Sequence, residues 1–183
     1  VEQSATPTGA PRVVVETDLL RAEVSAQGGD IVRLELKQHQ ASGEAGGNFV
    51  LLDDGTTRHQ YAAQSGLIGE GLPTHKTTFQ LPAGDLRLKD GEDSVVLRLP
   101  APEQGGVQVT KVMRFSRGSY LIDVSYEIRN GSGQAIAPHG YFQLTRDGNT
   151  AFLAPATTGP RVGVRVDANA NVNVDVRNGR VKG

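Results

Sequence analysis

The chain has 183 residues, 19 lysines and arginines against 20 aspartates and glutamates, and a formal net charge of −1 at pH 7. This length suits one domain with a sizeable core, and the balanced, scattered charges exclude long-range attraction to nucleic acid or to an anionic membrane. The absence of cysteine excludes disulfides, thiol nucleophiles and cysteine-ligated zinc.

The chain opens with a segment that has the composition of a linker. Residues 1–12 are rich in small residues and proline and show no periodicity, so we expect an extended linker. They contain no apolar stretch of the kind found in a signal peptide, and no window of the sequence approaches the roughly 18 apolar residues of a membrane span. We expect a soluble piece of a longer protein, with residues 13–160 as its one folded domain.

Short alternating stretches follow the linker and predict a β-meander. Residues 13–17 are a first candidate strand, and residues 20–26 alternate apolar and polar side chains, which is the period of a half-buried strand. Residues 28–30, with the sequence Gly-Gly-Asp, predict a turn because glycine adopts positive φ at little cost. The alternation then resumes at residues 32–36.

The middle of the chain has weaker signals. Residues 38–47 are polar and glycine-rich and predict a loop, whereas residues 48–53 are an apolar run that fits a covered strand. Residues 61–71 hold too many glycines for a helix and alternate too irregularly for a clear strand. Apolar positions from residue 79 to residue 88 predict two short strands around a turn at residues 82–84.

The most regular pattern of the chain lies between residues 107 and 130. It follows a turn at residues 89–93 and a strand at residues 95–99, and an Arg117-Gly118 turn divides it into two strands. The core face is predicted to carry Val107, Val109, Lys111, Met113 and Phe115 in the first strand and Tyr120, Ile122, Val124, Tyr126 and Ile128 in the second. This period of two predicts a half-buried antiparallel hairpin.

The remaining segments are shorter or less usual. Residues 134–138 and 141–144 predict two further short strands. From residue 162 to residue 176 every second residue is valine or alanine, with glycine, arginine, aspartate and asparagine between them. This pattern fits one long edge strand, two strands turned at residues 167–171, or a low-complexity tail. We therefore treat residues 161–183 as an atypical strand or tail.

Together the elements predict an all-β protein with the architecture of an antiparallel β-sandwich. No window keeps the apolar spacing of a helix over three turns. The 23 glycines and nine prolines interrupt the sequence at close to the spacing common in all-β folds.

Few residues are candidates for chemistry. The four histidines, His39, His59, His75 and His139, lack the spacing that presents two metal ligands on one strand or helix face, so we expect no metal site. A glycosidase or sugar epimerase would need carboxylates or a histidine that face each other across a cleft. Glu70, His75 and His139 are the conceivable members of such a set.

Three further motifs do not indicate an enzyme. Residues 66–71 resemble a phosphate-binding loop only superficially, because they lack the Lys-Ser/Thr ending and no helix is predicted after them. Ser65 and Ser119 lack a nucleophile elbow. Residues 130–132 match a glycosylation sequon and are better explained as a turn. We therefore expect no catalytic, cofactor-binding or metal-binding residues, and partner-binding residues stay unassigned.

Several short motifs occur in order along residues 13–160. They are VETDLL at 15–20, GGDI at 28–31, LEL at 34–36, FVLLD at 49–53, YAAQSGL at 61–67, RGSY at 117–120, VSY at 124–126, YFQL at 141–144 and TGP at 158–160. In this order they resemble the large periplasmic domain of bacterial YidC membrane insertases. The valine- and asparagine-rich segment after Pro160 departs from that family's pattern, which indicates a domain that is incomplete or altered at its C-terminus.

The resemblance implies a β-supersandwich with the topology of galactose-mutarotase-like domains, on the periplasmic side of the bacterial inner membrane. It implies a non-enzymatic role without cofactors in a protein that inserts and folds inner-membrane proteins. The implied partners are SecDF of the Sec translocon and nascent membrane proteins, with no nucleic acid. Membrane attachment would come only from helices absent from this chain, and the isolated domain is expected to be monomeric.

Three functions stay open at this point. An interaction domain would use exposed strand edges and an apolar groove to accept extended segments by β-augmentation. A carbohydrate-binding or mutarotase-like domain would need aromatic platforms, and the chain has no tryptophan, four tyrosines and five phenylalanines. A structural spacer would only hold the membrane portion in orientation.

Overall fold

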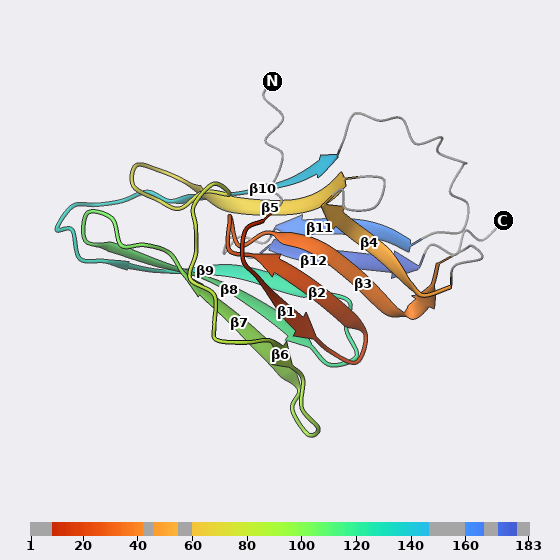
Figure 1. Ribbon diagram of the computed structural model, residues 1–183. Helices are drawn as coiled ribbons and strands as arrows, with labels where there is room; N and C mark the ends of the chain where they lie inside the picture. Colours follow the sequence, from red (N-terminus) through yellow and green to blue (C-terminus); the bar gives the residue numbers. More distant parts are fainter. Residues whose placement is uncertain (1–8, 42–45, 55–59, 147–159, 167–171, 179–183) are drawn as a thin grey trace.

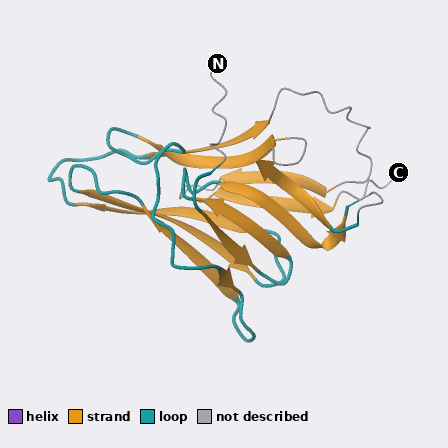
Figure 2. Ribbon diagram, in the orientation of Figure 1, coloured by secondary structure: helices purple, strands orange, loops and turns teal. Residues whose placement is uncertain are grey.

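A computed structural model of the protein describes residues 9–41, 46–54, 60–146, 160–166 and 172–178, and the regular elements in these ranges are all strands (Figure 2). The described part of the chain therefore holds no helix with the length and apolar character needed to cross a membrane. The prediction of an all-β fold is confirmed.

The strands form two sheets (Figure 1). They are β1 (Arg12–Glu16), β2 (Leu20–Ser25), β3 (Ile31–Gln40), β4 (Asn48–Asp54), β5 (Gln60–Ile68), β6 (Leu86–Arg87), β7 (Ser94–Pro100), β8 (Val107–Ser116), β9 (Ile122–Asn130), β10 (His139–Arg146), β11 (Pro160–Val166) and β12 (Val172–Asn178). The first sheet has the order β10-β5-β4-β3-β2-β1-β6 and the second has the order β11-β12-β9-β8-β7. The strand pairs are antiparallel, except that β6 runs parallel to β1.

The core lies between the sheets and is built from alternate residues of their strands. In β2, Leu20 and Val24 are fully buried, whereas Arg21 and Glu23 between them are only half-buried. One hydrophobic cluster includes Val15, Leu34 and Leu36 from the first sheet and Leu97, Met113, Phe115 and Ile122 from the second. Each large apolar side chain buried in this way contributes about 1.5–3 kcal/mol, so the alternation itself holds the two sheets together.

The regular pattern between residues 107 and 130 forms the β8–β9 hairpin of the second sheet. The pairing extends from Val107 opposite Asn130 to Phe115 opposite Ile122. Every residue predicted on the core face of β8 is buried, which confirms the hairpin. The connection is longer than the predicted two-residue turn, because the last pair is Phe115 with Ile122, which leaves residues 116–121 outside the β8–β9 ladder.

Two segments are more regular than their sequences predict. The ambiguous segment at residues 61–71 contains most of β5, a regular strand that tolerates Gly66 because the ring of Tyr141 lies over this glycine. Residues 38–40, predicted as part of a loop, extend β3, where Gln40 pairs with β4.

Two predicted short strands are wrong. Residues 79–81 form no strand, since Phe79 is buried in the core and only the N–H of Gln80 reaches a carbonyl of β7. Residues 134–138 belong to the connection into β10, which begins at His139 and not at residue 141.

The C-terminal segment forms two paired strands. β11 pairs with β12, and β12 pairs with β9 through residues 172–174. This agrees with the two-strand interpretation of residues 162–176, whereas the turn predicted at residues 167–171 lies outside the described residues. The boundaries of linker, domain and tail stay predictions.

Candidate interaction site

A lysine lies at the centre of the polar residues between the sheets. Lys111 occupies a core position of β8, and only 1% of its surface is exposed. Its Nζ donates hydrogen bonds to the carbonyl oxygens of Gly28, at 2.8 Å, and Ser65, at 3.4 Å, and lies 3.8 Å from Oδ1 of Asp30. The aliphatic stem completes the apolar layer, while the ammonium group connects the β2–β3 turn to β5.

Asp30 supplies the opposite charge and is 2% exposed. Its Oδ2 accepts a hydrogen bond from Nε2 of Gln64 at 3.0 Å, and Oε1 of Gln64 accepts one from Gln143 on β10 at 2.8 Å. No hydrogen-bond partner of its Oδ1 is found among the described residues. Burial raises the pKa of Asp30 to about 6 and lowers the pKa of Lys111 to about 8. At neutral pH both groups are therefore charged and form an internal ion pair.

Two tyrosines complete this region. The hydroxyl of Tyr126 on β9 lies 3.1 Å from Oγ of Ser65, and burial raises the pKa of Tyr126, so its hydroxyl stays neutral. Tyr141 on β10 lies directly opposite Gly66, where an added Cβ would come within 2.6 Å of the tyrosine Oη. Glycine is therefore required at residue 66 by the close approach of the ring. We refer to Asp30, Gln64, Ser65, Lys111, Tyr126 and Gln143 together as the polar cluster.

A strap, which we define as residues 69–78, follows β5 and is hydrogen-bonded to β5, to the β2–β3 turn and to Tyr141. It is fastened by backbone hydrogen bonds from Leu67 to the carbonyl of Pro73 at 2.9 Å and from Gly28 to the carbonyl of Thr77 at 2.8 Å. The two donors belong to β5 and to the β2–β3 turn, so the strap is held at two places on the first sheet.

His75 fastens the middle of the strap to Tyr141. The backbone N–H of His75 donates to Oη of Tyr141 at 2.9 Å, and Nδ1 of its ring lies 2.5 Å from the same oxygen. The two rings meet edge-on with centroids 5.8 Å apart. Burial lowers the pKa of His75, and the positive charges of Lys76 and Lys111 lower it further.

The beginning of the strap lines a cleft of about 540 Å³. The cleft lies where three loops meet at one end of the sandwich, at the left of Figure 1: residues 69–72, 104–107 and 132–137. Leu72 and Val107 give it an apolar floor, since both belong to a small hydrophobic cluster below the loops. Glycines and alanines form much of its wall, so the backbone of the loops is accessible from the cleft.

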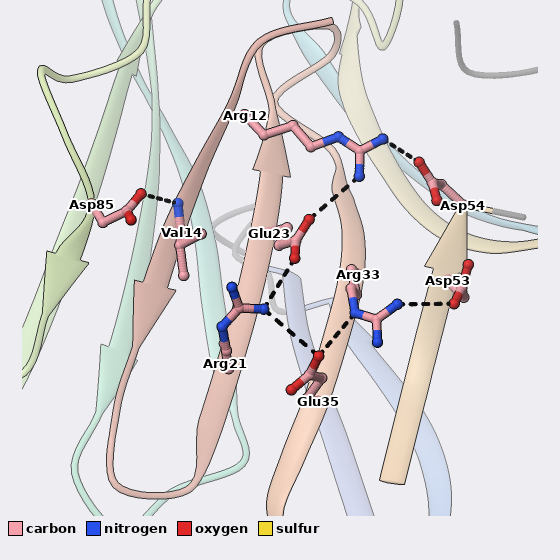
Figure 3. Close-up of polar contacts among 9 residues, drawn as sticks. All are labelled: Arg12, Val14, Arg21, Glu23, Arg33, Glu35, Asp53, Asp54 and Asp85. Carbon is pink, nitrogen blue, oxygen red and sulfur yellow. Dashed lines mark hydrogen bonds and ion pairs between the residues drawn. The ribbon is translucent and has the colours of Figure 1, made fainter. Parts of the chain in front are cut away.

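The outward face of the first sheet carries a ladder of ion pairs (Figure 3). The ladder consists of Arg12, Arg21, Arg33, Glu23, Glu35, Asp53 and Asp54. Arg33, for example, lies 2.9 Å from Glu35 and 3.2 Å from Asp53. Each arginine bridges two carboxylates, so the charges on this face compensate one another across β1 to β4.

The structure places the three predicted sugar-site residues in different settings. Glu70 lines the cleft, His75 is bound to Tyr141, and His139 is exposed, with its Nδ1 3.1 Å from the carbonyl oxygen of Ala137. The described residues contain no group of three histidines, aspartates or glutamates that could hold a metal ion.

The remaining candidate residues have structural surroundings. His39 packs beside the ring of Tyr120 at 5.5 Å, and His59 lies outside the described residues. Ser65 is bound to Tyr126 within the polar cluster. The Asn130 side chain accepts hydrogen bonds from Ser132, as a turn requires.

Sequence reasoning missed the pair of Lys111 and Asp30 and the contact of His75 with Tyr141. One signal was visible, since Lys111 was predicted on an otherwise apolar strand face. Its partners come from a turn and a strand of the other sheet, and nothing in the pattern of β8 indicates them.

Comparisons with known proteins agree with one another. The family model described as YidC periplasmic domain matches residues 12–165. The chain is 64% identical over 161 residues to the "Membrane protein insertase YidC" of Aromatoleum aromaticum, a match that covers 85% of this chain and 29% of that protein. It is 47% identical over 177 residues to the protein of the same name from Dechloromonas aromatica, covering 93% of this chain and 32% of that protein. The chain thus spans less than a third of the length of these curated relatives.

Proposed function

The chain belongs to the YidC periplasmic domain family, and on that premise we propose that it is a non-catalytic interaction domain of a membrane protein insertase. It acts on the periplasmic side of the inner membrane and assists the insertion and folding of inner-membrane proteins. Its partners are emerging segments of membrane-protein substrates and SecDF of the Sec translocon. It holds these partners and forms or breaks no covalent bond.

The cleft is the observation that carries this proposal. Its volume of about 540 Å³ is in the range of binding sites, and its floor of Leu72 and Val107 suits an apolar side chain. The accessible backbone of its wall can pair with the main chain of an extended segment. Ile68, which precedes the cleft-lining loop, is 61% exposed and adds apolar surface to its border. We therefore assign the cleft to an unfolded, partly apolar segment of substrate.

The edge of the first sheet offers a second line of contact. β10 is the terminal strand in the order of that sheet, and Leu144 on it is 51% exposed. A strand at the edge of a sheet can accept a further strand through main-chain hydrogen bonds. We assign this edge to the folded partner, SecDF. A regular series of main-chain hydrogen bonds suits a strand that belongs to a folded protein better than a nascent chain that moves past the domain.

The polar cluster supports a role without catalysis. Asp30 and Lys111 carry the strongly shifted pKa values of a catalytic pair, but they are 2% and 1% exposed. A group this deeply buried is out of reach of a substrate in the cleft. The cluster therefore serves to connect the sheets.

Site-specific photocrosslinking in the full-length insertase tests the proposal. A photoreactive amino acid replaces Gln104 or Gln134 at the cleft, or Leu144 at the edge, in cells that carry a stalled nascent membrane protein. We expect crosslinks to the nascent chain from the cleft positions and to SecDF from Leu144. Arg98, an exposed residue on the second sheet, is the matched control. Equal labelling from Arg98, or no labelling from the cleft, overturns the assignment.

The carbohydrate-binding alternative stays a prediction with its own test. The different settings of Glu70, His75 and His139 give it no specific support. Free galactose titrated into the domain would shift the amide NMR signals of residues 69–72 if a sugar site were present. The spacer alternative would instead be supported if an insertase without this domain retained every interaction with SecDF and substrate.

A further inference from the structure

One short segment connects the cleft to the elements around the polar cluster. The strap lines the cleft with residues 69–72, and residues 73–77 are hydrogen-bonded to β5, to the β2–β3 turn and to Tyr141. Because both functions belong to one continuous stretch of backbone, a displacement of its middle changes the cleft wall. That middle is held by the contact of His75 with Tyr141.

The hydrogen bonds at Tyr141 can be satisfied with His75 neutral. Oη of Tyr141 accepts the backbone N–H of His75, and its own hydrogen can be donated to Nδ1 of the ring. In that arrangement Nδ1 carries no proton and the ring proton is on Nε2. A proton on Nδ1 removes the O–H···N bond and turns the hydroxyl hydrogen away from the ring, so that the contact keeps only N–H groups donating to Oη.

The charged and titratable groups around the contact add to this preference. They are Lys76 on the strap, Lys111 on β8, Asp30 at the β2–β3 turn, Tyr126 on β9 and Tyr141 on β10, and His139 lies two residues before Tyr141 on the same strand. Lys76 and Lys111 oppose a positive charge on His75. The carboxylate of Asp30 is paired with Lys111 and bound by Gln64, and among the described residues no carboxylate is hydrogen-bonded to His75.

We propose that His75 and Tyr141 form an acid-sensitive latch that regulates the cleft. While His75 is neutral, the strap is closed against Tyr141 and the cleft wall is fixed. Protonation of Nδ1 releases the strap and opens the wall at residues 69–72. The use of the cleft by a substrate rests on the proposed function, whereas the latch is a property of the free domain.

The direction of the pH effect follows from proton linkage. The pKa of His75 is lowered from 6.5 in the closed state, so the released strap binds the proton more readily. The contribution of His75 to the stability of the closed state is therefore fully present above pH 6.5 and is lost as the pH falls below it. The contribution of Asp30 to stability changes with pH in the opposite direction. Its pKa is raised from 3.8 to about 6, so its protonation favours the packed state.

Three substitutions separate these effects. His75→Asn keeps an acceptor oxygen near the position of Nδ1 and removes the titration. Tyr141→Phe keeps the ring over Gly66 and removes the hydroxyl. His139→Asn removes an exposed histidine of the same strand and is the matched control.

Amide hydrogen exchange of the 183-residue chain at pH 7.5 and 5.0 provides the test. The reporters are the amides of Leu67 and Gly28, which donate to the strap, and the reference is the amide of Lys37, which donates to Leu19. In the wild type and in His139→Asn we expect the protection factors of the reporters to fall about fivefold to tenfold at pH 5.0 relative to the reference, as for the loss of one hydrogen bond.

The variants decide between the outcomes. His75→Asn should stay protected at both pH values, and Tyr141→Phe should be weakly protected at both. The same change of protection with pH in the wild type and in His75→Asn overturns the latch, because the contribution of Asp30 is common to both. A ¹⁵N spectrum that places the neutral ring proton of His75 on Nδ1 also overturns it. Exchange is measured without a partner, so failed crosslinking would overturn the proposed function and leave the latch standing.

Discussion

Lys111 occupies a position between Val109 and Met113 on the buried face of β8, where the strand pattern calls for an apolar side chain. Its ammonium is tolerated because the carbonyl oxygens of Gly28 and Ser65 replace water around it. The burial of this residue could be predicted from the alternation of its strand. Its partners could not be, because they meet it only after the two sheets pack.

We expect Lys111→Met to lower the free energy of unfolding by about 3 kcal/mol, because it leaves Asp30 buried without an opposite charge. Methionine retains much of the apolar stem of the lysine side chain. The change in the free energy of unfolding therefore measures the loss of the ammonium group. Urea unfolding at pH 7.5 measures it, with the exposed turn residue Lys89 changed to Met as the control, at a cost of less than about 0.5 kcal/mol. A loss as small as that of the control would contradict the role given to the pair.

At the scale of elements, the strands that were predicted best are those whose alternation is complete within the strand itself. The β8–β9 hairpin and the meander of β1, β2 and β3 could be read from the sequence. β5 could not, because its Gly66 is stabilised in the strand by Tyr141, a residue of another strand. Residues 134–138 were also predicted as a strand but contribute to the cleft wall instead of a ladder. The periodicity of a segment predicts which of its side chains are buried. It does not predict which strand or loop packs against them.

The ion-pair ladder of β1 to β4 should stabilise the first sheet modestly. We expect Arg33→Met to lower the free energy of unfolding by about 1 kcal/mol, because it separates Glu35 from Asp53 at a partly buried position. The loss should shrink in 1 M NaCl, since salt screens the carboxylates left behind. Arg87→Met is the matched control. The Arg87 side chain is 73% exposed and lies 3.5 Å from Glu16, so this substitution should not measurably change the free energy of unfolding in the same urea titration.

For the molecule as a whole, the main hydrophobic cluster determines the organisation. It contains buried residues of both sheets, so the two sheets share one main hydrophobic core. The fold class could be predicted from composition and spacing. The position of the strap and the cleft could not be, because they depend on how three loops meet at one end of the sandwich.

We expect the domain predicted at residues 13–160 to unfold in a single transition, because its two sheets share this cluster. Fluorotyrosine signals in the ¹⁹F NMR spectrum report the first sheet at Tyr141 and the second at Tyr126. Their midpoints in urea should coincide with that of circular dichroism. Two separate midpoints would show that the chain contains more than one cooperative unit.

The charge ladder on the first sheet has a consequence for the speed of encounter. Its arginines and carboxylates compensate one another at close range, and the whole chain carries a net charge of only −1. Such a surface projects little electric field into the solvent. The field therefore neither attracts a charged segment toward the domain nor orients it during the encounter. Association should then proceed at the unsteered rate of roughly 10⁵–10⁶ M⁻¹s⁻¹ and change little with ionic strength, whatever the charge of the segment that arrives.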